Sequence, residues 1–269
     1  MQAESIRRQL RRERRKKAIQ ESRRFLALVI LALCGFLAFQ TVSALRLVQE
    51  QTGTLAQSPI TVVLDAGHGG EDGGAVAGDG AQEKDVNLAV ALKLRPLLES
   101  SGIRVVMVRD SDCSVGDASL ETVKERKVSD LHHRLQLAQQ ESNAFFLSIH
   151  QNHYEEPQYY GTQVFYSPNH PDSQLLAESI QASVTEKMQP ENTRACKEAG
   201  NSIYLLWNLQ SPAVIIECGF LSNPSEAKQL QDSAYQTQMA FSIWSGFLNY
   251  LEESGQGDSL VMMNENRFS

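Results

Sequence analysis

Apolar residues follow two alternating patterns along this chain. Short runs are continuously apolar and rich in β-branched residues, which predicts buried strands. We expect these strands at residues 60–64, 103–108, 144–149, 162–166 and 213–216. Longer segments carry an apolar residue at every third or fourth position, which predicts helices. We expect the helices at residues 83–101, 128–141, 171–188 and 233–251, with one more that begins at Asn223.

Strands of this kind, alternating with helices, are typical of an α/β domain. A continuous apolar run indicates a strand that is covered on both faces, as in a parallel sheet between two layers of helices. We therefore predict a single domain with a mostly parallel twisted sheet flanked by helices. Pro96 interrupts the first helical pattern and should kink or end that helix early.

A basic segment and an apolar run precede this domain. Residues 1–24 carry ten Lys or Arg against three Asp or Glu, a net charge of about +7, which leaves about −14 for the rest of the chain. The apolar run from Phe25 to Leu45 is just long enough to cross a bilayer. A basic flank before such a run keeps the flank in the cytoplasm and directs the rest of the chain outward.

We interpret residues 1–24 as a basic cytoplasmic arm and residues 25–45 as a transmembrane signal anchor. The protein is then a single-pass protein of the cell membrane with an extracytoplasmic domain. A cleaved signal peptide stays open as an alternative, because the apolar run also resembles a signal-peptide core and could be cut after Ala44. A nucleic-acid-binding arm would not need the apolar stretch behind it, so we predict no nucleic-acid partner.

Polarity also suggests where the domain begins and ends. Residues 46–58 are polar and predict a linker, residues 59–253 form the predicted catalytic domain, and residues 254–269 form a polar tail. Three cysteines lie outside the apolar run, an odd number without the spacing of a disulfide scaffold. Among them we interpret Cys218 as a small buried hydrophobic residue.

Three side chains suited to metal binding or acid–base chemistry follow predicted strands. His68 lies in a glycine-rich loop after the first strand, His150 ends the third, and Glu217 ends the fifth. The carboxyl ends of parallel strands are where such sheets place their sites. Glu83 begins the first helix, close to the loop of His68. Two imidazoles and a carboxylate are the ligands of a catalytic zinc, and a further carboxylate is then needed as general base.

Each of these residues also has an ordinary interpretation. The glycines around His68 permit a sharp turn that exposes the imidazole, but a tight surface loop with an incidental histidine has the same pattern. His150 fits a hydrogen-bonded residue at the rim of the sheet. Glu217 is harder to explain, because a carboxylate that ends the apolar run 213–216 is costly to bury without a partner or a task.

Four separated motifs resemble a known family when they are taken together. They are Leu64-Asp65-Ala66-Gly67-His68-Gly69-Gly70, Glu83-Lys84-Asp85, Ser148-Ile149-His150-Gln151-Asn152 and Ile216-Glu217-Cys218-Gly219-Phe220-Leu221-Ser222-Asn223. Their order resembles the zinc-dependent N-acetylmuramoyl-L-alanine amidases, over residues 60–251. The anchor without a wall-binding repeat further resembles the membrane-anchored, germination-specific amidases of the spore cortex. His153 departs from the pattern, since the family usually has a small residue there, and we interpret it as a surface residue.

The resemblance implies that His68, Glu83 and His150 bind one zinc ion and that Glu217 is the catalytic residue. It implies hydrolysis of the amide bond between N-acetylmuramic acid and L-alanine of peptidoglycan, in the remodelling of the cell wall or the spore cortex. An activating protein partner is compatible with this function. Three more residues are candidates for orienting the substrate, although solvated charges or loop hydrogen bonds explain them equally: Asn152, Arg109 and Arg194.

Two other functions fit part of the pattern. An exported zinc peptidase or deacetylase would use the same types of ligand, and only the order of the motifs argues against it. A non-catalytic wall-binding domain would be expected to lack a ligand or the base, and none is missing.

Overall fold

The structure is a computed structural model that describes residues 60–141 and 144–256. Contacts divide the chain into two units, Met1–Gln57 and Ser58–Ser269, and all described residues belong to the second. No helix in the described ranges is both long and apolar enough to cross a membrane. The predicted arm, anchor and linker, and nearly all of the tail, lie outside the described residues and stay predictions.

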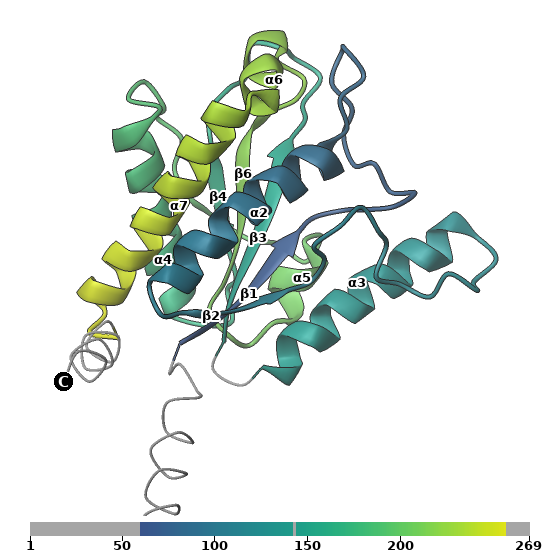
Figure 1. The fold of residues 1–269 in the computed structure, drawn as a ribbon, viewed down its shortest axis with the longest axis horizontal. Helices are drawn as coiled ribbons and strands as arrows, with labels where there is room; N and C mark the ends of the chain where they lie inside the picture. Colours follow the sequence, from purple (N-terminus) through teal and green to yellow (C-terminus); the bar gives the residue numbers. More distant parts are fainter. Residues whose placement is uncertain (1–59, 142–143, 257–269) are drawn as a thin grey trace, which may run out of the picture. The chain divides into compact units, whose positions relative to one another are not determined.

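A six-stranded sheet forms the centre of the domain (Figure 1). Its strands are β1 (Thr61–Ala66), β2 (Arg104–Met107), β3 (Ala144–Asn152), β4 (Gln163–Tyr166), β5 (Lys197–Glu198) and β6 (Ala213–Phe220), in the order β2-β1-β3-β6-β4-β5. Strands β2, β1, β3 and β6 are parallel, whereas β4 is antiparallel to β6 and parallel to β5. The α/β prediction is confirmed, but the sheet is mixed. No helix connects β3 to β4, so the chain reverses direction instead of making the crossover that a parallel strand requires.

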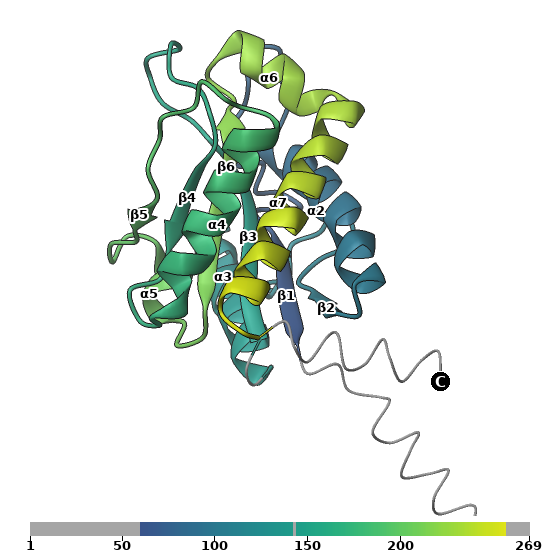
Figure 2. The ribbon, with the colours of Figure 1, turned by 90° about the vertical axis from the view of Figure 1, so that its left-hand side faces the viewer.

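Helices cover both faces of this sheet (Figures 1 and 2). On one face lie α2 (Glu83–Ser100), α4 (Asp172–Lys187) and α7 (Ser233–Glu253), on the other α3 (Val123–Gln140) and α5 (Tyr204–Asn208), and α6 (Pro224–Gln231) follows β6. Alternate residues of a strand belong to the hydrophobic cores on the two faces of the sheet. Val62 and Leu64 pack against the layer of α2, α4 and α7, and Val63 packs on the face of α3 and α5. Cys218 is fully buried in the first core, as a small hydrophobic residue should be.

Two helices differ from their predicted limits. Pro96 does not end α2, which continues to Ser100. The proline is exposed and close to the helix end, while Leu94 and Leu98 on the buried side hold the last turn against the core. Helix α3 begins at Val123, five residues before its predicted start, because Thr122 and Glu125 form a capping box.

The two strands that carry predicted site residues are longer than expected. Strand β3 continues past Ile149 to Asn152, and β6 continues past Ile216 to Phe220. Their polar residues are therefore held by ladder hydrogen bonds and not by loops. The short elements β5 and α5 were not predicted, since two and five residues are too few to show a periodic pattern.

Candidate active site

His68 lies in the glycine-rich loop after β1, with its backbone in the left-handed region. Its φ of 63° is the only positive value at a non-glycine residue in the described part of the chain. The Nδ1 atom lies 2.8 Å from Oδ2 of Asp72, which also pairs with Lys127. This contact directs Nε2 toward Glu83, whose Oε2 is 3.2 Å away. A carboxylate on the outer nitrogen is the usual support of a metal-binding histidine.

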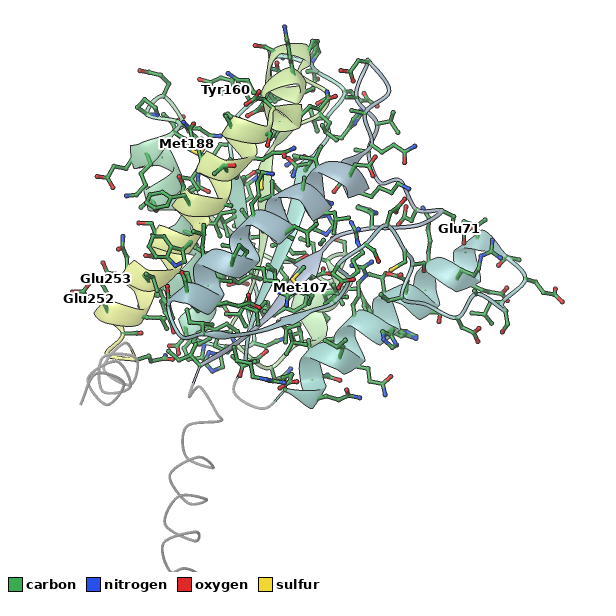
Figure 3. The ribbon with its side chains drawn as sticks, in the orientation of Figure 1. Glu71, Met107, Tyr160, Met188, Glu252 and Glu253 are labelled. Atoms are coloured by element: carbon green, nitrogen blue, oxygen red, sulfur yellow. The ribbon has the colours of Figure 1, made fainter. Side chains whose placement is uncertain are left out.

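Ion pairs attach the His68 loop to the N-terminal end of α3. Besides the contact between Asp72 and Lys127, Oε2 of Glu71 accepts a hydrogen bond of 2.8 Å from Arg126. Figure 3 labels Glu71 beside this end of the helix. The loop that presents the imidazole is thus held from outside as well as by its own turns.

Glu83 is the first residue of α2, and its carboxylate faces both imidazoles. Its Oε1 lies 2.9 Å from Nδ1 of His150, and the backbone N–H groups of Ala75 and Gln151 also donate to the carboxylate. Burial raises the pKa of Glu83, but the hydrogen bonds with His150 and His68 outweigh it, so the pKa falls well below its ordinary value. Glu83 is therefore an ionised group between two imidazoles.

These three side chains fit a divalent metal ion. One ligand atom from each of His68, Glu83 and His150 lies within 4.8 Å of the other two. Two imidazole nitrogens and a carboxylate oxygen are the donors of a catalytic zinc site. The neighbouring glycines are required for this cluster, because a Cβ atom at Gly67 would lie 2.1 Å from Nε2 of His150 and one at Gly74 would lie 2.5 Å from Oε2 of Glu83.

Glu217 lies on β6 directly opposite His150 of β3 in the strand pairing. Its Oε2 atom is buried and has no hydrogen-bond partner among the described residues. Burial raises the pKa of Glu217 to about 7, and the charge of Glu83 adds to the effect while the imidazoles oppose it. A buried carboxylate oxygen without a partner is costly, whereas a pKa near neutrality suits a general base.

A buried ion pair supports the backbone around His68. The sequence alone did not lead us to it. Arg134 of α3 pairs with the fully buried Asp65 of β1 and donates to the carbonyls of Ala66 and His68 at 3.0 and 2.7 Å. The hydroxyl of Ser148 donates to Asp65 at 2.6 Å. Asp65 ends an apolar run just as Glu217 does, so the cost of burying a carboxylate without a partner marks Asp65 as well.

Arg109 makes loop hydrogen bonds, one of the two explanations left open beside substrate binding. The residue is 3% exposed, and its guanidinium donates to the carbonyls of Ala66, Gly67, Lys84 and Ser111 at 2.8 to 3.0 Å. Arg109 thus joins the segment before His68 to the start of α2 and to the loop after β2. The geometry therefore favours a positioning role for Arg109 over contact with substrate.

Asn152 and Arg194, the other two predicted substrate residues, are brought together. Both line a cavity of about 310 Å³, along with Gln163 of β4, which is the strand partner of Glu217. His153 is exposed, in agreement with its interpretation as a surface residue.

The comparisons with known proteins agree with the site. A model of the N-acetylmuramoyl-L-alanine amidase family matches residues 62–249. The germination-specific N-acetylmuramoyl-L-alanine amidase of Bacillus subtilis is 38% identical over 194 residues, covering 72% of this chain and 81% of the relative. The CwlD amidase from Clostridioides difficile, solved in complex with the GerS lipoprotein, is 42% identical with a TM-score of 0.69, covering 71% of this chain and 98% of that one.

A further solved structure extends the likeness. The N-acetylmuramoyl-L-alanine amidase AmiC2 of Nostoc punctiforme is 30% identical with a TM-score of 0.60, covering 72% of this chain and 97% of that one. The family match spans most of the described domain and includes His68, Glu83, His150 and Glu217. The resemblance seen in the four motifs is thereby confirmed, and the chain belongs to the N-acetylmuramoyl-L-alanine amidase family.

Proposed function

We propose that this peptidoglycan amidase uses a zinc ion held by His68, Glu83 and His150, with Glu217 as its general base. The observation that carries the proposal is the buried Oε2 of Glu217, opposite His150, which has no partner in the described ranges. A carboxylate in that position is costly for stability alone, but it is suited to accept a proton beside a metal site.

Glu217 carries out the proton transfers of hydrolysis beside the metal ligands. Bound zinc would supply polarisation of the scissile carbonyl and a more acidic water. Glu217 takes a proton from the attacking water as the new C–O bond forms at the lactyl carbonyl carbon. It then gives this proton to the nitrogen of L-alanine as the C–N bond breaks. The products are N-acetylmuramic acid with a free lactyl carboxylate and a peptide with a free amino group.

The place of action is part of the proposal. We infer that residues 25–45 hold the enzyme in the membrane with its domain outside, because a basic flank precedes the apolar run. The mass of the full chain recovered from membranes tests this: an uncleaved anchor predicts the intact chain, and a chain that begins at Leu45 would show cleavage instead.

The spore cortex is the proposed target. Support comes from the relative in Bacillus subtilis that is named as germination-specific. The related amidase solved with a lipoprotein also suggests that an exported lipoprotein assists this chain. Cortex muropeptides from a strain that lacks the gene test the target, and unchanged cortex with altered vegetative wall would overturn it.

Mass spectrometry of muropeptides tests the reaction and the base together. The full-length chain is incubated with purified peptidoglycan and zinc, beside Glu217→Gln. We expect stem peptides with a free L-alanine amine from the parent and almost none from the variant. Products from both proteins at similar rates would remove Glu217 from the mechanism, and cleavage at another bond would favour the peptidase alternative.

A further inference from the structure

A second polar feature lies beside the catalytic carboxylate, in the cavity of about 310 Å³. Its walls come from the ends of β3 and β6, from β4, and from the loops that follow β3 and precede β5. Its lining includes Tyr154, Tyr159, Gln163, Arg194, Lys197 and Phe220. The proposed reaction does not use any of them.

Arg194 is held rigidly at this cavity. Its guanidinium carbon lies 4.4 Å from the centre of the Phe220 ring and 5.7 Å from that of Tyr159. Its Nε donates to the carbonyl of Tyr160, labelled in Figure 3, at 2.8 Å, and Nη1 donates to Oε1 of the buried Gln163 at 3.2 Å. These contacts fix the plane of the guanidinium before any ligand arrives.

The positive charge of Arg194 is nevertheless left open. Its Nη2 atom has no hydrogen-bond partner within the described ranges, and no carboxylate there forms an ion pair with Arg194 or Lys197. The charge of Arg194 acts electrostatically on Glu226. Both oxygens of Glu226, however, accept backbone hydrogen bonds from Gly161 and Phe220 and form no ion pair with Arg194 within the described residues. Two cations thus face one cavity of a domain that is acidic as a whole.

The other arginines of the described domain contrast with Arg194. Four of them form ion pairs with carboxylates, and Arg109 places four of its five N–H donors on backbone carbonyls; the paired ones are Arg95, Arg104, Arg126 and Arg134. A planar, preorganised guanidinium with free donors is the geometry that binds a carboxylate.

We propose that this cavity is a subsite for a carboxylate of the stem peptide, with Arg194 as its main anchor and Lys197 as a second positive charge. The subsite rests on the proposed function, since it selects the peptide that leaves with L-alanine. The aromatic rings of Tyr154, Tyr159 and Phe220 would pack against the peptide's apolar atoms.

Distance along the sheet indicates which carboxylate is bound. Gln163, which holds Arg194, is the direct strand partner of Glu217. Neighbouring strands lie about 4.8 Å apart, so an anion at Arg194 lies roughly 5 to 10 Å from the reacting bond. An extended residue spans about 3.5 Å, so this range corresponds to about two residues beyond the reacting bond. The second residue of the stem peptide is the D-glutamate that follows L-alanine, and its α-carboxylate is therefore the group that fits.

Two matched substrates test the subsite with the full-length, zinc-loaded chain. Both are N-acetylmuramoyl tripeptides, and they differ only in whether the D-glutamate α-carboxylate is free or amidated. We expect the parent to prefer the free acid about tenfold in kcat/KM, the effect of one charge-assisted hydrogen bond. Arg194→Gln should lower the free-acid value to that of the amide and remove the preference. Lys197→Gln should reduce the preference by less, because its side chain is exposed.

The ratio between the substrates separates binding from a merely structural role. Loosening of the loop would lower both values together and leave the ratio unchanged, and that result would overturn the proposal. Equal rates of the parent on both substrates would overturn it as well. Arg95→Gln, which removes an arginine paired with Glu99 on α2, is the matched control and should change neither value.

A binding measurement keeps the subsite distinct from the catalytic proposal. Calorimetry compares the dipeptide L-Ala-D-Glu, its α-amide and N-acetylmuramic acid on the parent and on Arg194→Gln. Preference for the free-acid dipeptide that disappears in the variant supports the subsite even if no substrate is hydrolysed. Arg194-dependent binding of N-acetylmuramic acid alone would instead assign the site to the lactyl carboxylate and overturn the peptide assignment.

Discussion

Glu83 and Glu217 are two carboxylates that face the same pair of imidazoles in opposite surroundings. Glu83 begins a helix and accepts hydrogen bonds from two backbone N–H groups, and its pKa is lowered. Glu217 lies within a strand, its Oε2 has no partner among the described residues, and burial raises its pKa to about 7. Surroundings that stabilise the charge of a carboxylate suit it to the role of metal ligand. Surroundings of low dielectric that destabilise the charge raise the pKa and suit the carboxylate to the role of general base.

Exchanging each carboxylate for its amide is the strongest way to break this comparison. We expect Glu217→Gln to bind zinc like the parent while kcat falls by about a thousandfold, within the 10²–10⁴ range for general acid–base catalysis. Glu83→Gln should instead lose zinc, because a charged ligand is removed. Zinc content by elemental analysis and kcat on muropeptides check both. Loss of zinc in Glu217→Gln would end the contrast.

Asp65 offers a third case, a buried carboxylate whose charge serves stability. Asp65→Asn removes the fully buried partner of Arg134, which keeps its second ion pair with Asp130, so the change should cost about 3 kcal/mol in the free energy of unfolding, the lower end of the range for a broken buried pair. Glu141→Gln, at an exposed pair with Arg104, is the control and should cost less than about 1 kcal/mol. Urea unfolding at pH 7 measures both. Equal losses in the free energy of unfolding for the two variants would show that burial does not determine how much an ion pair contributes.

The same carboxylate predicts a dependence on pH. Burial raises the pKa of Asp65, but the charge of Arg134 and the hydrogen bond from Ser148 leave it below its ordinary value of 3.8. The stabilisation is therefore complete above about pH 4 and is lost as the pH falls through the lower, folded-state pKa. Asp65→Asn should lack this part of the acid-induced loss of stability.

Gly67→Ala tests whether the ligand cluster depends on the space that a glycine leaves. The new Cβ atom would meet the imidazole of His150 at 2.1 Å and displace it from Glu83. We expect zinc affinity to fall by about 100-fold, the upper range for a disturbed ligand environment. Competition with a chromogenic chelator measures the affinity. Gly78→Ala, whose Cβ atom meets no atom of the described residues within 4 Å, should leave the affinity unchanged.

Asp72→Asn tests the outer support of His68 and should have the smallest effect. The amide keeps an acceptor near Nδ1 but loses the charge, so we expect zinc affinity to fall by about tenfold. Turnover at saturating zinc should change little. Asp79→Asn, at an exposed position of the same region, is the control. An unchanged affinity would show that Asp72 only holds Lys127.

The strands, the helices and the positions of the site residues could be predicted because each depends on residues that are neighbours in the sequence. Periodicity located five of the six strands of the described domain and its major helices, and the positions of His68, His150 and Glu217 after apolar runs placed them at one edge of the sheet. Buried apolar faces require such patterns, so the patterns can be recognised without the structure.

Strand pairing and long-range contacts had to come from the tertiary structure. The antiparallel β4, the extension of β3 and β6 that sets His150 opposite Glu217, and the link between Asp65 and Arg134 join residues far apart in the chain. Residue type did not distinguish the arginines: Arg109 donates four hydrogen bonds to backbone carbonyls, whereas Nη2 of Arg194 has no partner among the described residues. The sequence by itself determined the elements and the chemical types at the site. Only the packing of distant segments decided which charges are neutralised and which remain available.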